Sequence, residues 1–280
     1  MKKQTGGLVA VFMALLAVTL GGIILHQLTG YDYPASAKAA YEMNVIGDLY
    51  EAFLLVPTGI VGLLALRKGS AWGPVLIGGV ASTFAYNYTL ASSGQQNLWI
   101  FLYVAKLALG ALSVCFVWDL LPVGSSRPSR VRPTMAGYLG VLVVLFSALM
   151  GMRLYASANG DVMEMSMQVT GAVDWAEPVV RDPIIFFAFA VPLFLTAVFG
   201  LLRRTEAGSR AATLASTFMV NMVIMIIMTG PVKELMQMGA LSPGMLPISI
   251  VFLVTAAPAV WGLIWLVRGD GKLSEGRRVA

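Results

Sequence analysis

The chain has 280 residues, of which 58% are hydrophobic and only 12% are charged, with a mean hydropathy of +0.80 and a formal net charge of +5. Soluble globular domains carry about 25% charged residues, so this composition excludes an ordinary soluble protein. The positive charge does not call for a nucleic acid, because a basic protein face beside anionic lipid accounts for it.

Eight continuous apolar runs follow one another along the chain, and each is long enough for a helix that crosses a bilayer. The runs are unbroken rather than alternating, which excludes an outer-membrane barrel. We therefore predict an all-α integral membrane bundle of eight transmembrane helices. Their approximate ranges are 7–28, 45–66, 72–92, 97–121, 133–155, 183–202, 211–230 and 245–267.

Two halves of the chain resemble each other at an offset of 134 residues. Ala-Ser-Thr-Phe-Ala-Tyr-Asn at 81–87 returns as Ala-Ser-Thr-Phe-Met-Val-Asn at 215–221, and Asp48 falls on Asp182. We predict a tandem 4+4 repeat, with a first unit at 1–121, a cytoplasmic linker at 122–134, a second unit at 135–268 and a cytoplasmic tail at 269–280. An even number of spans gives both units the same orientation, with a pseudo-twofold axis along the membrane normal.

Basic residues predict the orientation of the bundle. In the eight-span topology only Lys38, Arg153, Arg181 and Lys233 fall on one side, and Lys106 lies within a helix. The other fourteen basic residues of the helix ends and connections fall on the opposite side. The positive-inside rule then predicts that both termini are cytoplasmic. The N-terminal apolar run is longer than a signal peptide core, so we expect it to remain as a span.

Ionisable residues inside the predicted helices are the strongest candidates for function. Asp48 and Glu51 share a helix face, and Lys106 lies about 13 Å inside its own helix at 1.5 Å per residue. We expect Lys106 to pair with Glu51, leaving one carboxylate in excess that can hold a proton. The functional interpretation predicts a water-accessible cavity at this pair, open to the outer side. The structural alternative is a buried ion pair that only fixes helix register.

Other polar residues complete the candidate lining of the site. The ligand-binding or proton-coupling candidates are Asp48, Glu51, Tyr86, Asn87, Tyr88, Tyr103 and Lys106, and the secondary polar candidates are Asn221, Arg153 and Asp182. The two asparagines recur in the repeated motif, so their alternative role is hydrogen bonding between helices.

The methionine, histidine and cysteine content limits which cofactors the protein can hold. Met163, Met165 and Met167 alternate in one outer loop, and thioethers suit Cu(I), although methionine also fills irregular contacts. The single His26 is expected to be an interfacial residue, and the single Cys115 excludes an intrachain disulfide. No nucleotide-binding or hydrolase motif is present, so we expect no further cofactor and favour a protein that is not an enzyme.

One set of motifs resembles an uncharacterised family of bacterial multi-pass membrane proteins. The motifs are Asp48-Leu-Tyr-Glu, Pro57, Arg67-Lys-Gly-Ser, Tyr86-Asn-Tyr, Phe101-Leu-Tyr-Val and Arg181-Asp-Pro-Ile-Ile-Phe-Phe. The resemblance implies the bacterial inner membrane and no particular activity.

Three functions remain open at this point. The first is an outward-facing polar site that binds or transports a small solute or proton, with the lipid bilayer as the surrounding partner. The second is a scaffold or accessory subunit for another membrane protein or for a homo-oligomer. The third is copper handling.

Overall fold

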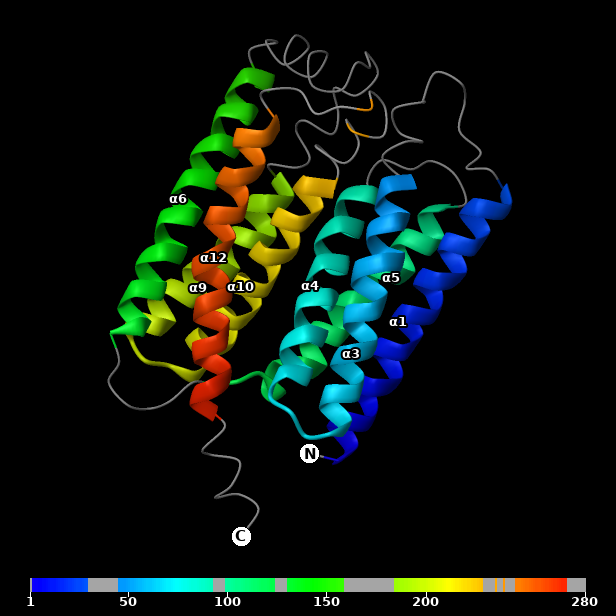
Figure 1. Cartoon of the computed structure of the whole chain (residues 1–280), viewed down its shortest axis with the longest axis horizontal. Helices are drawn as coiled ribbons and strands as arrows, with labels where there is room; N and C mark the ends of the chain where they lie inside the picture. Colours follow the sequence, from blue (N-terminus) through cyan, green and yellow to red (C-terminus); the bar gives the residue numbers. More distant parts are fainter. Residues whose placement is uncertain are drawn as a thin grey trace.

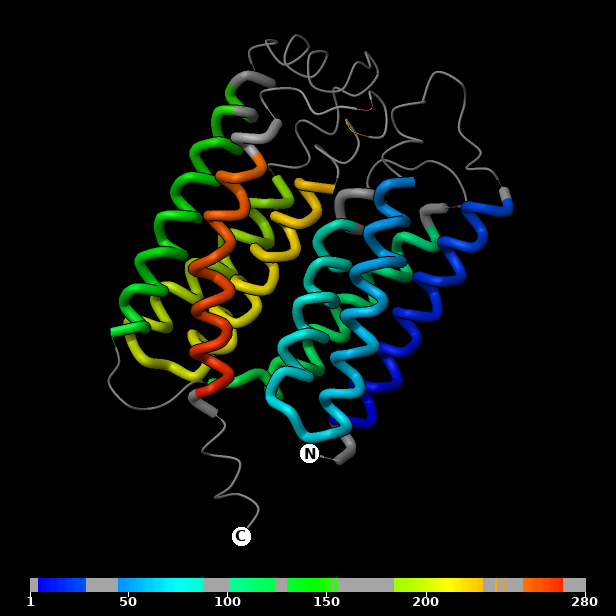
Figure 2. Tube along the Cα trace, viewed as in Figure 1, coloured from blue at the N-terminus to red at the C-terminus, as the bar shows by residue number. Residues whose placement is uncertain are grey.

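The computed structural model describes residues 2–29, 45–92, 99–123, 130–158, 184–228 and 245–270, and the single residues 235 and 239. Within these ranges the chain is all-helical, without strands. The all-α prediction is therefore confirmed for the described residues. Figures 1 and 2 show two groups of helices side by side. The first group ends, after α5, at the same end of the bundle as the N-terminus of the chain.

The first group holds four helices. They are α1 (Lys2–Thr29), a helix that passes through the π-helical turn η2 (Glu51–Leu55) into α3 (Val56–Arg67), α4 (Trp72–Ser92) and α5 (Trp99–Val117). A short 3-10 turn, η3 (Trp118–Leu120), follows. In Figure 1 the end of α1 and the start of α5 lie at the top, and we call this the upper end.

The second group repeats this order. It holds α6 (Val131–Ala158), a helix that passes through η4 (Phe186–Ala190) into α9 (Val191–Leu202), then α10 (Glu206–Ile227) and α12 (Met245–Asp270). The predicted helix ranges agree with these bounds to within a few residues. The largest differences are at the starts of α1 and α10, which each begin five residues before the predicted positions 7 and 211. Helix α10 begins early because Thr205 caps it by accepting a hydrogen bond from the Gly208 N–H at 3.0 Å.

Local geometry recurs at matching places in the two groups. Helices α1 and α6 each have 28 residues, and α3 and α9 each have 12. Each of the latter follows a five-residue π-helical turn and carries a proline at its start, Pro57 or Pro192. Proline removes a backbone donor and crowds the preceding turn, which accounts for a wide turn at both places.

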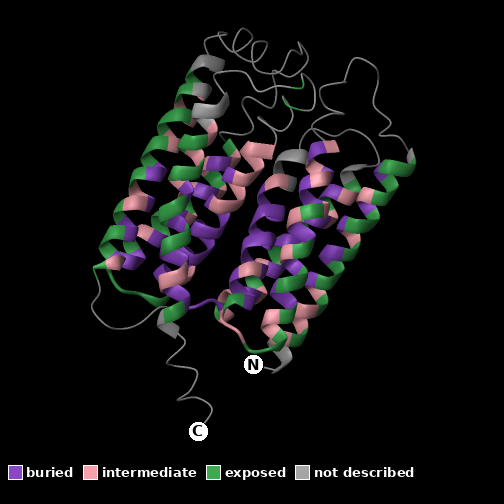
Figure 3. Ribbon diagram, in the orientation of Figure 1, coloured by how far each residue is buried: buried purple, intermediate pink, exposed green. Residues whose placement is uncertain are grey.

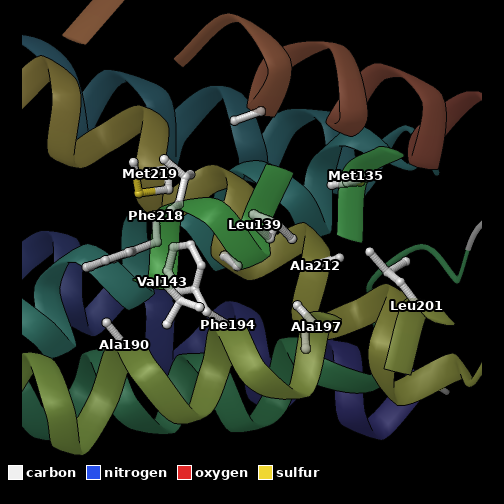
Figure 4. Close-up of a cluster of buried hydrophobic side chains, with 14 of the residues drawn as sticks. Met135, Leu139, Val143, Ala190, Phe194, Ala197, Leu201, Ala212, Phe218 and Met219 are labelled. Atoms are coloured by element: carbon white, nitrogen blue, oxygen red, sulfur yellow. The ribbon is translucent and has the colours of Figure 1, made fainter. Parts of the chain in front are cut away.

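Each group buries its own hydrophobic core. One cluster is built from helices of the first group, together with Leu214 of α10. The other is built from helices of the second group, together with Tyr86 of α4. Figure 4 shows part of the second cluster, where side chains of α6, α9 and α10 meet around Phe194 and Phe218. Among the buried core residues, the two groups therefore exchange Leu214 and Tyr86. Partly buried side chains also cross, since Leu193, Ile224, Met225 and Met228 pack against the first cluster and Trp118 packs against the second.

Six helices of the described residues are long and apolar enough to cross a membrane, within Thr5–Leu28, Val45–Arg67, Phe101–Leu120, Val131–Met152, Glu206–Ile227 and Ser249–Arg268. The remaining two are the shorter Phe186–Leu202 and α4. Helix α4 packs against α3, α5 and α10, and most of its residues from 73 to 86 are buried (Figure 3). A helix enclosed by other helices does not need the lipid-facing residues that raise hydropathy. A multi-pass membrane bundle is thus supported, and eight spans remain a prediction.

The contact between α4 and α10 does not follow the repeat register. Asn221 contacts Thr83 at a separation of 138 residues, and Gly79 faces Thr217 at the same separation. A twofold axis along the membrane normal would place repeat equivalents, 134 residues apart, at the same height. These two contacts are displaced by four residues, or about one helical turn, from the separation of 134, whereas the rings of Tyr86 and Phe218 meet at a separation of 132.

Candidate functional site

The π-helical turn η2 brings Glu51 into the interior of the first group. Glu51 opens this turn and is 5% exposed, and Asp48 lies three residues earlier on the same helix. The matching turn η4 opens with Phe186 instead. Single π turns inside α-helices are common at functional sites. Only the first group therefore carries a carboxylate at this position.

The predicted pairing of Lys106 with Glu51 is present. The Lys106 Nζ donates to Glu51 Oε2 at 2.8 Å, and the two side chains are 0% and 7% exposed. An ammonium group inside a helix bundle is costly unless a counter-charge neutralises it. The ion pair joins α5 to the helix that contains η2, and these two helices are separated by the whole of α4 in sequence.

His26 is not the interfacial residue that the sequence predicted. It is 2% exposed, and its Nδ1 donates to Asp48 Oδ2 at 2.9 Å. The reason for the difference is position: His26 lies three residues before the end of α1, level with the start of the next helix, so its ring turns inward to a carboxylate. Asp48, the carboxylate that we expected to lack a counter-charge, thus has His26 as its partner. Asp48 near the upper end of the helix is the signal that could have identified it.

These four side chains, His26, Asp48, Glu51 and Lys106, form what we call the charged cluster. Tyr103 lies beside it, with its ring 6.3 Å from the His26 ring in an edge-on arrangement, and it precedes Lys106 by one helical turn. Three helices of the first group supply the cluster. With His26 protonated its formal charge is zero, and with His26 neutral it is −1, so the cluster can change its charge by one proton.

The predicted water-accessible cavity is not formed at Lys106. No water-sized space touches the Lys106 side chain, since its exposure is 0%, and Tyr103 is 2% exposed. Neighbouring side chains fill the space around the ammonium group. The carboxylates and the imidazole keep only a few per cent exposure. The four side chains of this cluster are therefore almost fully closed to solvent.

Not all of the remaining candidate residues of the first group lie at the charged cluster. The Tyr86 ring packs on Phe218 and Phe189 of the second group, at centroid distances of 5.0 and 6.0 Å. The Asn87 Oδ1 is buried and accepts no hydrogen bond. The side chain of Tyr88 lies outside the described residues. Tyr86 thus belongs to the contact between the two groups.

Asn221 takes part in the same contact. Its Nδ2 donates to the Gly79 carbonyl oxygen at 3.1 Å and to Thr83 Oγ1 at 2.8 Å. Its backbone carbonyl accepts a hydrogen bond from the Tyr50 hydroxyl at 3.2 Å. The sequence analysis missed Tyr50, which directly precedes Glu51. The Asp48-Leu-Tyr-Glu segment therefore connects the charged cluster to the second group through one tyrosine.

Several candidates lie outside the described residues. These are Asp182, the side chain of Arg153, and Met163, Met165 and Met167. The copper hypothesis is therefore still a prediction. Among the described residues no group of three or more histidine, cysteine, aspartate or glutamate side chains is arranged to hold a metal ion.

Comparison of the chain with protein-family models, with curated proteins and with solved structures found no match.

Proposed function

We propose that this chain is a multi-pass membrane protein that binds and releases a proton at the charged cluster, as the proton-coupling site of a transporter. The observation that carries the proposal is the buried hydrogen bond between His26 Nδ1 and Asp48 Oδ2. Asp48 precedes Glu51 by three residues on the same helix, and Glu51 forms a second buried pair with Lys106. Ionisable groups within membrane spans are rare, and chains of them mark proton pathways.

The composition of the cluster supports a proton rather than a solute. Histidine is the side chain whose charge changes most readily between about pH 5 and 8. Two carboxylates and one ammonium group surround it, so the cluster is neutral with the proton bound and carries one negative charge without it. Because Lys106 is fully enclosed, a solute site at this place requires rearrangement, whereas proton transfer requires only a hydrogen-bonded path.

The test measures proton binding and proton flux in the same samples. The full chain is reconstituted in liposomes, and infrared difference spectra between about pH 5 and 8 report carboxyl and imidazole protonation. Flux is measured with a trapped pH-sensitive dye under an imposed potential. We expect a titrating signal and a flux in the unmodified protein, and the loss of both in His26→Gln and Asp48→Asn. Asp119→Asn, which alters an exposed carboxylate, is the matched control and should change neither.

A titration identical in all four proteins would show that the cluster does not bind a proton, and the proposal would be wrong. If the cluster titrates but no proton flux is measured, proton binding stands and the transporter function is wrong.

A scaffold is the second candidate, and the closed packing around Lys106 favours it. In that case both ion pairs only fix the positions of α1, α5 and the helix between them. Substitution of the His26–Asp48 pair by apolar residues of similar size would then leave folding intact, since replacing a whole buried pair is often neutral or stabilising. The same proteoliposomes would show no proton-dependent signal.

A further inference from the structure

We infer that, in the conformation that the structure shows, the charged cluster exchanges its proton with the upper end of the bundle, and that an apolar seal in the first group blocks exchange with the lower end. The inference rests on the proposed proton binding and adds the side from which the proton comes. Three observations carry it: the height of the cluster, the packing beneath it, and the hydrogen bonds of the hydroxyl groups within that packing.

The cluster lies near the upper end of the first group. His26 lies three residues before the end of α1, and Asp48 lies three residues after the first described residue of its helix. At 1.5 Å per residue, about 5 Å of helix separates either residue from that end. The side chains of His26, Asp48 and Glu51 keep 3%, 7% and 7% exposure, whereas Lys106, seven residues inside α5, has 0%. The small exposure of the cluster therefore belongs to its other three members.

Apolar side chains fill the space directly beneath the cluster. Leu55 lies one turn below Glu51 and is 1% exposed. One turn further down, a Cβ atom on Gly59 would lie 3.1 Å from Phe12 Cζ and 3.1 Å from Leu16 Cδ2, so α1 and α3 are in close contact there. We call this layer the apolar seal. Its members, each at most 4% exposed, are Phe12, Leu15, Leu16, Leu55, Ile77 and Phe84.

Helix α5 completes the seal through a close contact with the backbone of α4. A Cβ atom on Gly110, one turn below Lys106, would lie 3.0 Å from the Ala81 carbonyl oxygen and 3.0 Å from the Ala85 backbone nitrogen. A contact this close leaves no room for a water molecule between the two helices. Buried residues continue down α5 from Lys106 to Val117, over about 16 Å at 1.5 Å per residue.

The hydroxyl groups at these heights do not form a path for a proton. Thr19, Ser82 and Thr83 are buried, and each donates to a carbonyl oxygen of its own helix, at 2.8, 3.0 and 2.9 Å. Ser113 is the only hydroxyl residue of α5 below Lys106, and its Oγ is buried without a hydrogen-bond partner among the described residues. An isolated hydroxyl does not conduct, because proton relays are chains of neighbouring polar groups.

The contact between the two groups is also closed below the cluster. A Cβ atom on Gly78 would lie 2.9 Å from Leu214 Cδ2, and one on Gly79 would lie 2.9 Å from Thr217 Cβ. Side chains of α10 therefore fill the space beside the two glycines. Apolar spaces in proteins stay dry, and apolar constrictions stop ions by excluding water. A proton from the lower end thus meets a dry layer, whereas one from the upper end has a short distance to cross.

A pH jump on one side of the membrane tests the inference. The full chain is reconstituted into liposomes at high lipid excess, with a histidine-free tag after residue 280, which follows the lower end of α12. Resin that binds the tag separates vesicles that expose the lower end from those that expose the upper end. The outside medium is stepped from about pH 8 to pH 5, and time-resolved infrared absorption follows the imidazole band. Because His26 is the only histidine, this band reports the cluster alone.

We expect the imidazole band to change at least about tenfold faster in vesicles that expose the upper end. Equal rates in the two orientations, or a faster rate from the lower end, would show that the seal does not block the proton, and the inference would be wrong. A band that changes in neither orientation would instead contradict the proposed proton binding, and with it the one-sided exchange.

Thiol labelling tests the seal without relying on proton binding. All variants carry Cys115→Ser. Single cysteines replace Leu16 or Leu55 in the seal, and Lys68→Cys, at an exposed position after the lower end of α3, is the control. A water-soluble, membrane-impermeant thiol reagent is added on the lower side, and elution as a monodisperse species establishes that each variant is folded.

We expect Lys68→Cys to react, and Leu16→Cys and Leu55→Cys to react at least about a hundredfold more slowly, because a thiol in dry apolar surroundings does not ionise readily. A rate at Leu55→Cys close to that of Lys68→Cys would show that water from the lower end reaches the layer beneath Glu51, and the inference would be wrong.

Discussion

At the scale of single residues, buried charge decides how the first group of helices is held together. Lys106 and Glu51 were predictable as a pair, because each lies within an apolar helix and an uncompensated charge there is expensive. His26 was not predictable by the same argument. A histidine three residues from a helix end fits either an interfacial position or an inward one, and only the height of Asp48 distinguishes them.

Removal of one member of the buried pair should be costly. Lys106→Met leaves the Glu51 carboxylate without its partner at 2.8 Å, so we expect a loss of about 3–5 kcal/mol in the free energy of unfolding. The double change Lys106→Met with Glu51→Gln should recover part of this loss. Unfolding in detergent, followed by circular dichroism, measures both.

The exposed pair Arg210 and Asp119 provides the control, and Arg210→Met should cost no more than about 1 kcal/mol. Additive losses at Lys106 and Glu51 would show that the two side chains do not stabilise each other.

At the scale of elements, helix ranges were predictable and helix packing was not. Continuous apolar runs set where helices begin and end, and Pro57 and Pro192 marked the two places where the helix widens. The register of α4 on α10 depends on which small residues meet. The repeated Ala-Ser-Thr-Phe motif did not indicate which residues meet, whereas the structure places Thr217 and Leu214 against Gly79 and Gly78.

The turn from α9 to α10 should tolerate no added side chain. A Cβ on Gly208 would lie 2.1 Å from the Gly200 carbonyl carbon, a backbone atom that cannot move aside. Gly208→Ala should therefore force α9 and α10 apart and cost about 1–3 kcal/mol or more. Thermal unfolding in detergent measures this loss.

Gly151→Ala is the matched control for that substitution, because nothing lies within 4 Å of its added Cβ. It should stabilise α6 by about 0.5–1 kcal/mol through its helix propensity. An equal effect of both substitutions would indicate that the close approach of the two glycines is not maintained in the membrane.

At the scale of the whole molecule, the orientation in the bilayer follows from the distribution of basic residues, which the fold itself does not test. Reporter domains fused after residues 68, 128, 206 and 275 should report the cytoplasm, and fusions within 157–178 should report the outer side. A cytoplasmic signal from 157–178 would contradict the eight-span topology, and with it the same orientation of the two repeats.

The separate cores have a consequence for how the protein is made. When the ribosome has released the first 121 residues, the helices that bury most of the first core are already complete, and the missing contacts are those of Leu214 and of the partly buried Leu193, Ile224, Met225 and Met228. From the first group, the second core takes the Tyr86 ring and the partly buried Trp118, both of which precede the second group in the chain. Two fragments divided within 122–134 and synthesised separately should therefore insert, fold and find each other, with α4 and α10 as the surfaces that join them.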